Sequence, residues 1–493
     1  MPHRKLIALV VALLLLGGVG VFLATRRSPA PARTAAGASD RPSTDADAGK
    51  ADDADASGDP DGGDTTDLRL QALHDAAAAG TLGVDAVVPR TAPAGWSGEH
   101  VVSRRYDDWE PAIAADPHAP YVYRLVTRYG GPKACKQCPD PAIVLQVSRN
   151  DGRTWGPSRF LCRCKGTTGQ YDPQIEVVAD TGAVDASFMR GYSVWFTRSS
   201  DHGRTWSKAV PVAPAVAWQD KDILAPAANG TDVYIAFNGP TDGDAWVSSS
   251  HDGGSTWSPV KVTNSKRYLY AFGGHVLADG TVVFSESSLL YANARDLVGN
   301  TREVAIRSTD GGTTWHAVQV DVLQLGRVCT SKGCPADFYD GHSALGLDGR
   351  GRLLMVVDGA VRPRRPRRIY AYLSTDEGKT WGPRILLSIP GVNAGFPAVT
   401  GTPNGRFLVW FMDQRTGRWN VWFRRSADTR TWSRALKLSN AIGGAVYKSR
   451  AGFLEAYGDY GEIDVTDRGT PVAIWGEGPS YAGPGGCWYT RRL

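Results

Sequence analysis

Residues 308–315 read Ser-Thr-Asp-Gly-Gly-Thr-Thr-Trp, and nearly the same residues recur along the chain. The other copies are SRNDGRTW at 148–155, SSDHGRTW at 199–206, SHDGGSTW at 250–257, STDEGKTW at 374–381 and SADTRTW at 426–432. The last copy lacks one residue and its glycine. Successive copies start 51, 51, 58, 66 and 52 residues apart, which indicates a repeat architecture with one copy in each structural unit.

The residue types in this motif suit a tight turn that is fixed by its own side chains. Serine and aspartate side chains bond turn amides, and glycine supplies the positive φ that such turns require. The tryptophan that follows is suited to packing between neighbouring sheets. We therefore expect the aspartates of the repeat to be structural and assign none of them to catalysis.

Each copy resembles the Asp box, also called the BNR repeat, of the sialidase superfamily of β-propellers. The resemblance implies an all-β propeller whose boxes lie between the third and fourth strands of each blade, away from the central site. It also implies a glycoside-hydrolase type of activity on glycans.

A second recurring pattern marks the innermost strand of each blade. Seven short apolar runs fit it, but only six boxes are present. The seventh run ends with the chain and is one strand short, whereas residues 96–103 (WSGEHVVS) resemble the strands that follow a box. We therefore predict seven blades, the last closed by this N-terminal strand, which removes an exposed sheet edge. Six blades remain the alternative if one start is misread. The seven runs begin at Pro111, Pro173, Ile223, His275, Ser343, Pro397 and Glu462.

The first 95 residues differ in composition from the rest of the 493-residue chain. Residues 6–24 carry no charge and lie between basic residues, so we predict a signal anchor over 1–27, with a cleaved signal peptide as the alternative. Residues 28–95 are predicted to be a disordered acidic linker, and residues 96–493 the propeller. The expected protein is attached to the cell membrane through one N-terminal helix, with an extracytoplasmic propeller, or is secreted if the signal is cleaved.

The charge of the chain is unevenly distributed. Ten aspartates against Arg41 and Lys50 give residues 40–67 a net charge of −8, so the overall +5 leaves +13 for the remainder. A basic body favours anionic partners. Because export is expected and nucleic-acid motifs are absent from the sequence, we expect an extracellular glycan as partner, no nucleic acid, a monomer and no cofactor.

Acidic and aromatic residues dominate the loops expected on one face of the ring, where the inner strands begin. Aromatic faces stack on sugar rings, and paired carboxyls supply general acid and base or nucleophile. The alternative for each acid is a cap on a turn. The predicted catalytic residues are Tyr460, Glu462, Asp108, Glu110 and Asp172. The predicted substrate-binding residues are Trp109, Tyr171, Asp222, Tyr270, Asp340, His342, Arg362, Arg364 and Arg365.

The resemblance to sialidases assigns roles to some of these positions. Tyr460 matches the family's nucleophile, with Glu462 as a possible base partner. The family's Arg-Ile-Pro is replaced by Trp109-Glu110-Pro111, and Ser287 stands where a second arginine is expected. Without that guanidinium cluster, bidentate recognition of the sialic acid carboxylate is lost. Sialic acid hydrolysis itself is therefore not expected, and a non-catalytic glycan- or protein-binding propeller is the alternative function.

Two further features fall in loops of the same face. The segment 361–368 (VRPRRPRR) carries five arginines and is a candidate reader of an acidic polymer or a solvated surface loop. Cys135, Cys138, Cys162 and Cys164 are expected to converge there, as disulfides or as a four-thiolate zinc site. Cys329 and Cys334 lie in the loop before the fifth blade, and Cys487 is left over.

Overall fold

The computed structural model describes residues 92–103, 105–292, 297–327, 340–439, 448–449, 452–453, 455–478 and 486–493. The predicted anchor at 1–27 and nearly all of the predicted linker at 28–95 lie outside this range. None of the described helices is long and apolar enough to cross a membrane.

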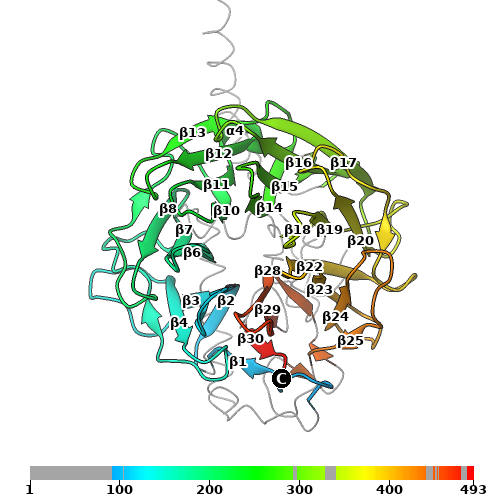
Figure 1. The fold of residues 1–493 in the computed structure, drawn as a ribbon, viewed down its shortest axis with the longest axis horizontal. Coiled ribbons are helices and arrows are strands. Elements are labelled where there is room, and N and C mark those ends of the chain that lie inside the picture. The colour runs from blue at the N-terminus through cyan, green and yellow to red at the C-terminus, as the bar shows by residue number, and fades with distance from the viewer. Residues whose placement is uncertain are drawn as a thin grey trace, which may run out of the picture. The chain divides into compact units, whose positions relative to one another are not determined.

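The described chain forms seven four-stranded antiparallel sheets arranged as blades around a central axis (Figure 1). This confirms the seven-bladed propeller. Blade 1 contains β2 (Asp107–Ala115), β3 (Val122–Tyr129), β4 (Ala142–Ser148) and β5 (Arg159–Phe160). Blade 2 contains β6 (Gln170–Val177), β7 (Val184–Arg190), β8 (Val194–Ser199) and β9 (Val210–Pro211). Blade 3 contains β10 (Asp220–Pro226), β11 (Val233–Asn238), β12 (Ala245–Ser250) and β13 (Ser258–Lys261), with α4 (Pro240–Gly243) between β11 and β12.

The remaining blades repeat this meander. Blade 4 contains β14 (Tyr268–Val276), β15 (Val282–Leu289), β16 (Asn300–Ser308) and β17 (His316–Gln324). Blade 5 contains β18 (Ser343–Leu347), β19 (Leu353–Gly359), β20 (Arg368–Ser374) and β21 (Ile385–Leu386). Blade 6 contains β22 (Ala394–Gly401), β23 (Phe407–Asp413), β24 (Asn420–Ser426) and β25 (Leu436–Lys437). A two-stranded ribbon, β26 (Lys448–Ser449) and β27 (Gly452–Phe453), precedes blade 7.

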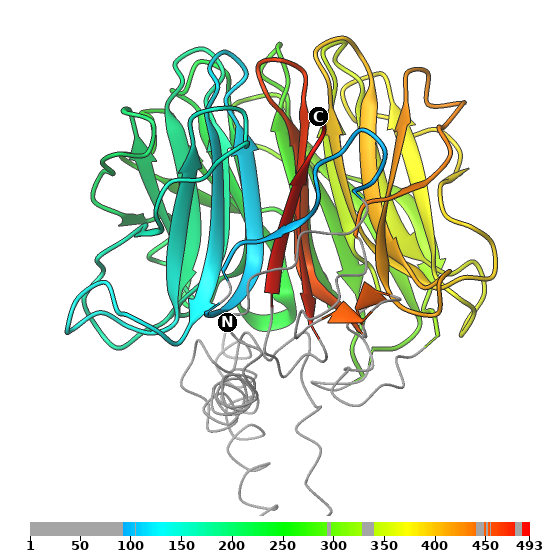
Figure 2. The same cartoon turned by 90° about the horizontal axis from the view of Figure 1, so that it is seen from below.

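Blade 7 is built from both ends of the propeller. β28 (Glu455–Val465), β29 (Pro471–Gly478) and β30 (Gly486–Arg491) supply three strands, and β1 (His100–Val101) supplies the fourth. β1 pairs with β30 in the register His100↔Tyr489 and Val101↔Trp488, and the two strands run side by side in Figure 2. The predicted closure by an N-terminal strand is therefore confirmed, and the outer edge of β30 is not left exposed.

The Asp boxes occupy the loops between the third and fourth strands of blades 1 to 6, as predicted. In each box the serine Oγ accepts the amide N–H of the turn residue, for example Gly203 to Ser199 at 2.9 Å. In five boxes the aspartate Oδ1 accepts the amide of the threonine before the tryptophan, as Asp201 does from Thr205 at 2.8 Å, and in the first box Asn150 takes this role. In the glycine-less box Thr429 adopts φ 62°. The boxes therefore close turns, and their acids are structural.

Apolar clusters fill the interfaces between neighbouring blades rather than one central core. One cluster joins blades 6 and 7 and includes Trp410, Trp475 and Trp488. Trp96 also lies in it, 2% exposed, with its ring centroid 5.0 Å from that of Phe423. The segment before β1 is thus anchored by a buried indole as well as by strand pairing.

We predict that Trp96→Ala lowers the free energy of unfolding by about 3–5 kcal/mol, because it leaves a cavity under the closing strand. Chemical denaturation followed by tryptophan fluorescence and circular dichroism would measure this. The half-buried Trp218 provides a control, since Trp218→Ala removes the same indole from the loop before β10, away from the closing strand. Equal losses in the two variants would contradict the role of Trp96 in closure.

Candidate functional site

The inner strands share a distortion near the edge at which they begin. A β-bulge interrupts their pairing with the second strand in six blades, for example between Trp109 and Ala112 in blade 1. We call this edge of the ring the bulge face and the opposite edge the Asp-box face. Bulges redirect side chains and are frequent next to active sites. The bulge face is also the one on which the sequence placed the candidate residues.

Four bulges hold a non-glycine residue at positive φ, a conformation that costs energy. These residues are Glu110 (φ 51°), Asp172 (φ 50°), Lys221 (φ 56°) and Phe396 (φ 53°). Three of the four precede a proline. Sequence reasoning used those prolines to mark strand starts but missed the bulges, although the repeated X-Pro pairs were the available signal.

The bulge residues contact one another around the axis. The Glu110 carboxylate accepts the amide N–H of Asp172 at 3.0 Å, which links blade 1 to blade 2. The Lys221 ammonium lies 4.8 Å from the centre of the Phe272 ring, which links blade 3 to blade 4. His342 continues this arc between Phe272 and Phe396. Its ring centroid lies 5.2 Å from the first and 4.6 Å from the second.

The predicted catalytic acids of blades 1 and 2 are all buried. Asp108 forms a bidentate ion pair with Arg128, at 2.7 and 2.9 Å, and both side chains are buried. Glu110 and Asp172 are 2% and 1% exposed. Since the Asp108 carboxylate is engaged by Arg128 and that of Glu110 binds the next blade, the geometry gives both a structural role. Their catalytic role, and that of Asp172, stays a prediction.

The aromatic rings predicted to bind substrate are mostly enclosed by protein. Trp109 and Tyr171 are each 2% exposed and pack with Tyr129 between blades 1 and 2. Tyr270 is 8% exposed, and its ring stacks on that of Tyr268 with centroids 6.1 Å apart. Little surface of these rings is therefore available to a sugar.

The predicted polar binding residues of blades 3 and 5 are held in buried networks. Asp340 pairs with Arg367 through two contacts of 2.7 and 2.6 Å. Asp358 accepts the amides of Gly341 at 2.9 Å and His342 at 3.1 Å. Asp222 accepts the Ser187 hydroxyl, and burial raises the pKa of its carboxyl to about 7.

A cavity of about 130 Å³ lies on the axis and is lined by all seven inner strands. Three carboxyls line or face it, those of Glu176, Glu462 and Asp464. Glu462 accepts the amide of Ile113 at 2.5 Å, and Asp464 accepts that of Ala115 at 2.7 Å. These carboxyls therefore bind the channel-facing edge of β2 and tie the last blade to the first.

The axial carboxyls hold their protons more tightly than in water. Burial raises the pKa of Glu462 to about 8 and that of Asp464 to about 6. Burial and the neighbouring Asp464 and Glu462 also raise the pKa of Glu176 well above its ordinary value. Among the candidates with described side chains, Glu462 is thus the one that lines the axial cavity with a pKa suited to proton transfer near neutrality.

Tyr460 lies in the bulge of β28, between Tyr457 and Gly461, two residues before Glu462 on the same strand. Its side chain lies outside the described part of the structure. The sequence placed Tyr460 in the loop that enters the inner strand, whereas the strand already begins at Glu455. The catalytic roles of Tyr460 and Glu462 stay predictions.

The arginine segment lies where the sequence predicted, between β19 and β20 on the bulge face. Arg362, Arg364 and Arg365 are exposed, whereas Arg367 is fully buried in its pair with Asp340. The five arginines therefore comprise three exposed side chains, the buried anchor Arg367 and the half-buried Arg368 at the start of β20.

Four cysteines form two disulfides, Cys135–Cys138 and Cys162–Cys164. Their loops adjoin, since the amide of Gly166 donates to Gln137 O at 2.8 Å. Cys329 and Cys334 lie outside the described residues. Within the part that the structure describes, no three histidine, cysteine, aspartate or glutamate side chains are arranged to hold a metal ion.

The BNR/Asp-box repeat family matches residues 306–317, which span the box of blade 4. No curated protein matches the chain. Among solved structures, the Hadza microbial sialidase Hz136 is 14% identical (TM-score 0.41), over 71% of this chain and 73% of its own. A protein of unknown function from Dyadobacter fermentans is 13% identical (TM-score 0.44), over 80% and 97%. An ulvan lyase of polysaccharide lyase family PL25 is 12% identical (TM-score 0.47), over 77% and 93%.

The repeated boxes and the seven four-stranded blades define this protein as an Asp-box β-propeller. The BNR/Asp-box match at 306–317 agrees with the resemblance that the six boxes indicated from the sequence.

The raised pKa of Glu462 predicts a pH dependence of stability. Between its ordinary value of 4.5 and about 8, the folded carboxyl keeps a proton that the unfolded chain releases. The free energy of unfolding should therefore fall as pH rises through this window. Glu462→Gln keeps an acceptor for the Ile113 amide and should make that slope shallower.

Urea unfolding between pH 4.5 and 9 would measure the effect. Asp464→Asn is the matched control. The pKa of Asp464 is raised only to about 6, so this variant should change the slope below pH 6 but not between pH 6 and 8. Identical slopes for the wild type and Glu462→Gln between pH 6 and 8 would show that Glu462 is not protonated in the folded protein.

Proposed function

We propose that the propeller binds an anionic extracellular glycan on its bulge face. The observation that carries this proposal is a cluster of four exposed arginines, here called the arginine patch: Arg327, Arg362, Arg364 and Arg365. None of the four has an acidic partner within the described residues. Unpaired guanidinium groups recognise carboxylate and sulfate groups through paired hydrogen bonds.

The arginine patch is built on two loops that are bonded to each other. Gln324 and Ala360 exchange backbone hydrogen bonds of 2.7 and 3.1 Å. Arg364 N–H donates to Leu325 O at 2.9 Å, and Arg327 N–H donates to Arg365 O at 3.0 Å. The segment after β17 thus continues as a ladder against the β19–β20 loop, and less ordering is needed when a ligand binds.

The buried pair Asp340–Arg367 supports this ladder from below. Besides holding Asp340, the Arg367 guanidinium donates to Arg327 O at 2.5 Å. One arginine of the segment is therefore used to position the loop that presents the others. This arrangement favours a binding surface over the alternative of a merely solvated charge run.

Export is part of the proposal. The uncharged run 6–24 supports an N-terminal anchor or signal, and the disulfides Cys135–Cys138 and Cys162–Cys164 are typical of oxidising compartments. An extracytoplasmic propeller meets glycans rather than nucleic acids. The pKa values of Glu462 and Glu176 are raised, so these axial carboxyls are largely protonated at neutral pH. They therefore repel an anionic ligand less than ionised carboxylates would.

We predict that Arg362→Ala/Arg364→Ala/Arg365→Ala weakens binding of an acidic polysaccharide such as polygalacturonate at least about tenfold and lowers its salt dependence. Biolayer interferometry with the full-length chain at several salt concentrations would measure both. The control is Arg204→Ala/Arg430→Ala/Arg434→Ala, which removes the same charge from exposed positions around the Asp boxes. If both triple variants weaken binding equally, the effect comes from the net charge of the protein and not from the arginine patch.

A second candidate function is glycoside hydrolysis, favoured by Glu462 directly after the bulge that carries Tyr460. In this reaction the Tyr460 oxygen attacks the anomeric carbon as Glu462 takes the phenolic proton, the glycosidic bond breaks, and the aglycone leaves as an alcohol after taking a proton from water. A water molecule then hydrolyses the glycosyl–tyrosine bond, which releases the sugar and restores the Tyr460 hydroxyl. Because only the ionised carboxylate accepts a proton, turnover should rise with pH through about 8.

Release of sugar from uronate polymers and sialosides tests this second function. Tyr460→Phe and Glu462→Gln should each abolish turnover, by about 10²-fold or more, without unfolding the protein. If the wild type releases no sugar while it binds the polymer, the hydrolase candidate fails and the binding function stands.

A further inference from the structure

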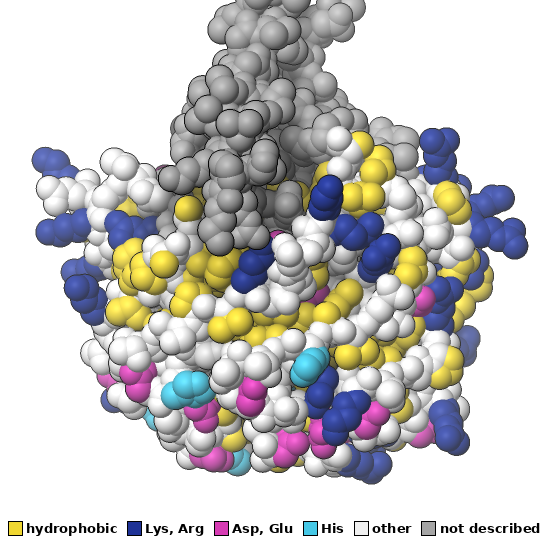
Figure 3. Space-filling model, turned by 90° about the horizontal axis from the view of Figure 1, so that it is seen from above, with side chains coloured by type: hydrophobic (Ala, Val, Ile, Leu, Met, Phe, Trp, Pro, Cys, Tyr) yellow, Lys and Arg dark blue, Asp and Glu magenta, His cyan; other side chains and the backbone are white. Residues whose placement is uncertain are grey.

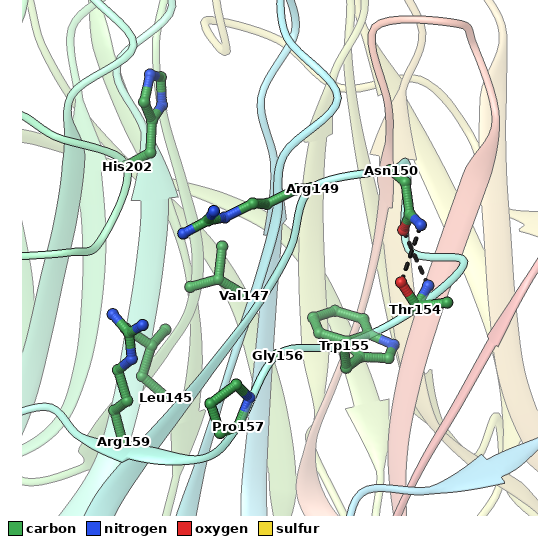
Figure 4. A pocket seen from close by; sticks show the side chains of 10 residues that line it. All are labelled: Leu145, Val147, Arg149, Asn150, Thr154, Trp155, Gly156, Pro157, Arg159 and His202. Carbon is green, nitrogen blue, oxygen red and sulfur yellow. Dashed lines mark hydrogen bonds between the residues drawn. The ribbon is translucent and has the colours of Figure 1, made fainter.

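A groove of about 400 Å³ opens between blades 1 and 2 at the level of the Asp boxes, away from the axis (Figure 4). Its apolar floor is formed by Val147 and Pro157 above the buried Leu145, and its rim carries Arg149, Arg159 and His202. No aspartate or glutamate is among its lining residues. None of the residues predicted from the sequence as functional lies in it.

The local sequence explains why this groove is open. Box 1 continues as Trp155-Gly156-Pro157, and the outer strand β5 begins only at Arg159. Gly156 has no side chain, and its N–H is already bonded to Val147 O at 2.9 Å. Pro157 has no N–H to extend the ladder. In blade 3, by contrast, the outer strand β13 begins directly after the box tryptophan, at Ser258.

The cationic side chains of the rim are not neutralised. Arg149 and Arg159 are exposed and form no ion pair or side-chain hydrogen bond with a described residue. In Figure 4 the Arg149 guanidinium reaches into the space between His202 and Trp155, and that of Arg159 lies beside Leu145 on the opposite side of Val147 from Trp155. The nearest box acids are bonded elsewhere, as Asp151 is to Arg153 at 2.9 Å and Asp201 is to Thr205.

The walls of the groove are ordered. The His202 ring stacks on Tyr121 with centroids 4.1 Å apart, and its Nδ1 lies 3.4 Å from Tyr123 Oη. Asn150 and Thr154 bond each other reciprocally, each contact being 2.9 Å long. A ligand would therefore meet a preformed surface with an apolar base and a cationic rim.

We propose that this groove is a second carbohydrate-binding site, specific for a saccharide unit that carries a carboxylate or sulfate group. The apolar floor suits the C–H face of a sugar ring, and Arg149 and Arg159 suit its acidic substituent. The volume is within the range of small-ligand sites. The proposal is independent of the arginine patch, because the two sets of residues lie in different blades and on different faces of the ring.

Blade 5 provides an internal comparison. Its box continues as Trp381-Gly382-Pro383, and a groove of about 620 Å³ follows in the same position. There Arg384 is held by Asp321 through a 2.7 Å contact. With that guanidinium neutralised, the second groove lacks the paired free cations and is predicted to bind acidic sugars more weakly.

Isothermal titration calorimetry of the full-length chain with tetragalacturonate tests the proposal, with galactotetraose as the neutral probe. If the arginine patch also binds the probe, the wild type takes up two equivalents. Arg149→Ala/Arg159→Ala should lose one equivalent, or at least about tenfold in affinity at the groove. The control Arg204→Ala/Arg434→Ala removes the same charge from exposed positions at other Asp boxes that do not line the groove.

The outcomes separate this site from the proposed function. Loss of one equivalent in the groove variant, with the other retained, supports the second site. Loss of binding only in the variant of Arg362, Arg364 and Arg365 overturns the second site and leaves the proposed function. Equal binding of galactotetraose overturns the specificity for acidic sugars. Thermal unfolding of each variant confirms that it is folded.

Discussion

The pairing of β1 with β30 is the constraint on which the rest of the molecule depends. A ring of sheets has no free edge only if its last blade is completed, and here two residues from the start of the propeller complete it. Trp96 anchors the same segment in the apolar cluster between blades 6 and 7. Because closure fixes the seven inner strands relative to one another, it also fixes every side chain that meets on the axis.

On the axis, the exposed edges of the inner strands impose a second requirement. Their channel-facing N–H and C=O groups lack a neighbouring strand, and buried polar backbone must be bonded. Glu462 and Asp464 satisfy two amides of β2, and His275 bonds Leu345 O at 3.0 Å across blades 4 and 5. The polar residues of the channel thus stabilise the ring before they perform any chemistry, and the raised pKa values are a consequence of that burial.

Much of the fold was predictable because its signals are local. Each Asp box closes a turn mainly with its own serine, aspartate and glycine, so the six copies marked six of the seven blades. The seventh blade lacked its fourth strand in the sequence, and residues 96–103 resembled the strands that follow a box. Together these two observations predicted the closure. The site was less predictable. The sequence placed Asp108, Asp340 and the arginine segment on the correct face, but it did not show that Arg128 and Arg367 would neutralise the first two.

The structural role of the boxes and the face that gathers acids, aromatics and arginines could be read from the sequence, and seven blades could be favoured over six, because these follow from spacing and turn chemistry within one blade. Only the tertiary structure decided which of those side chains are buried partners and which face solvent. Ion pairs such as Asp340–Arg367, the contacts of the bulge residues around the axis and the groove beside Trp155 all join segments that are distant in sequence or belong to different blades. Their formation depends on how the blades pack against one another, which cannot be predicted from a short stretch of sequence.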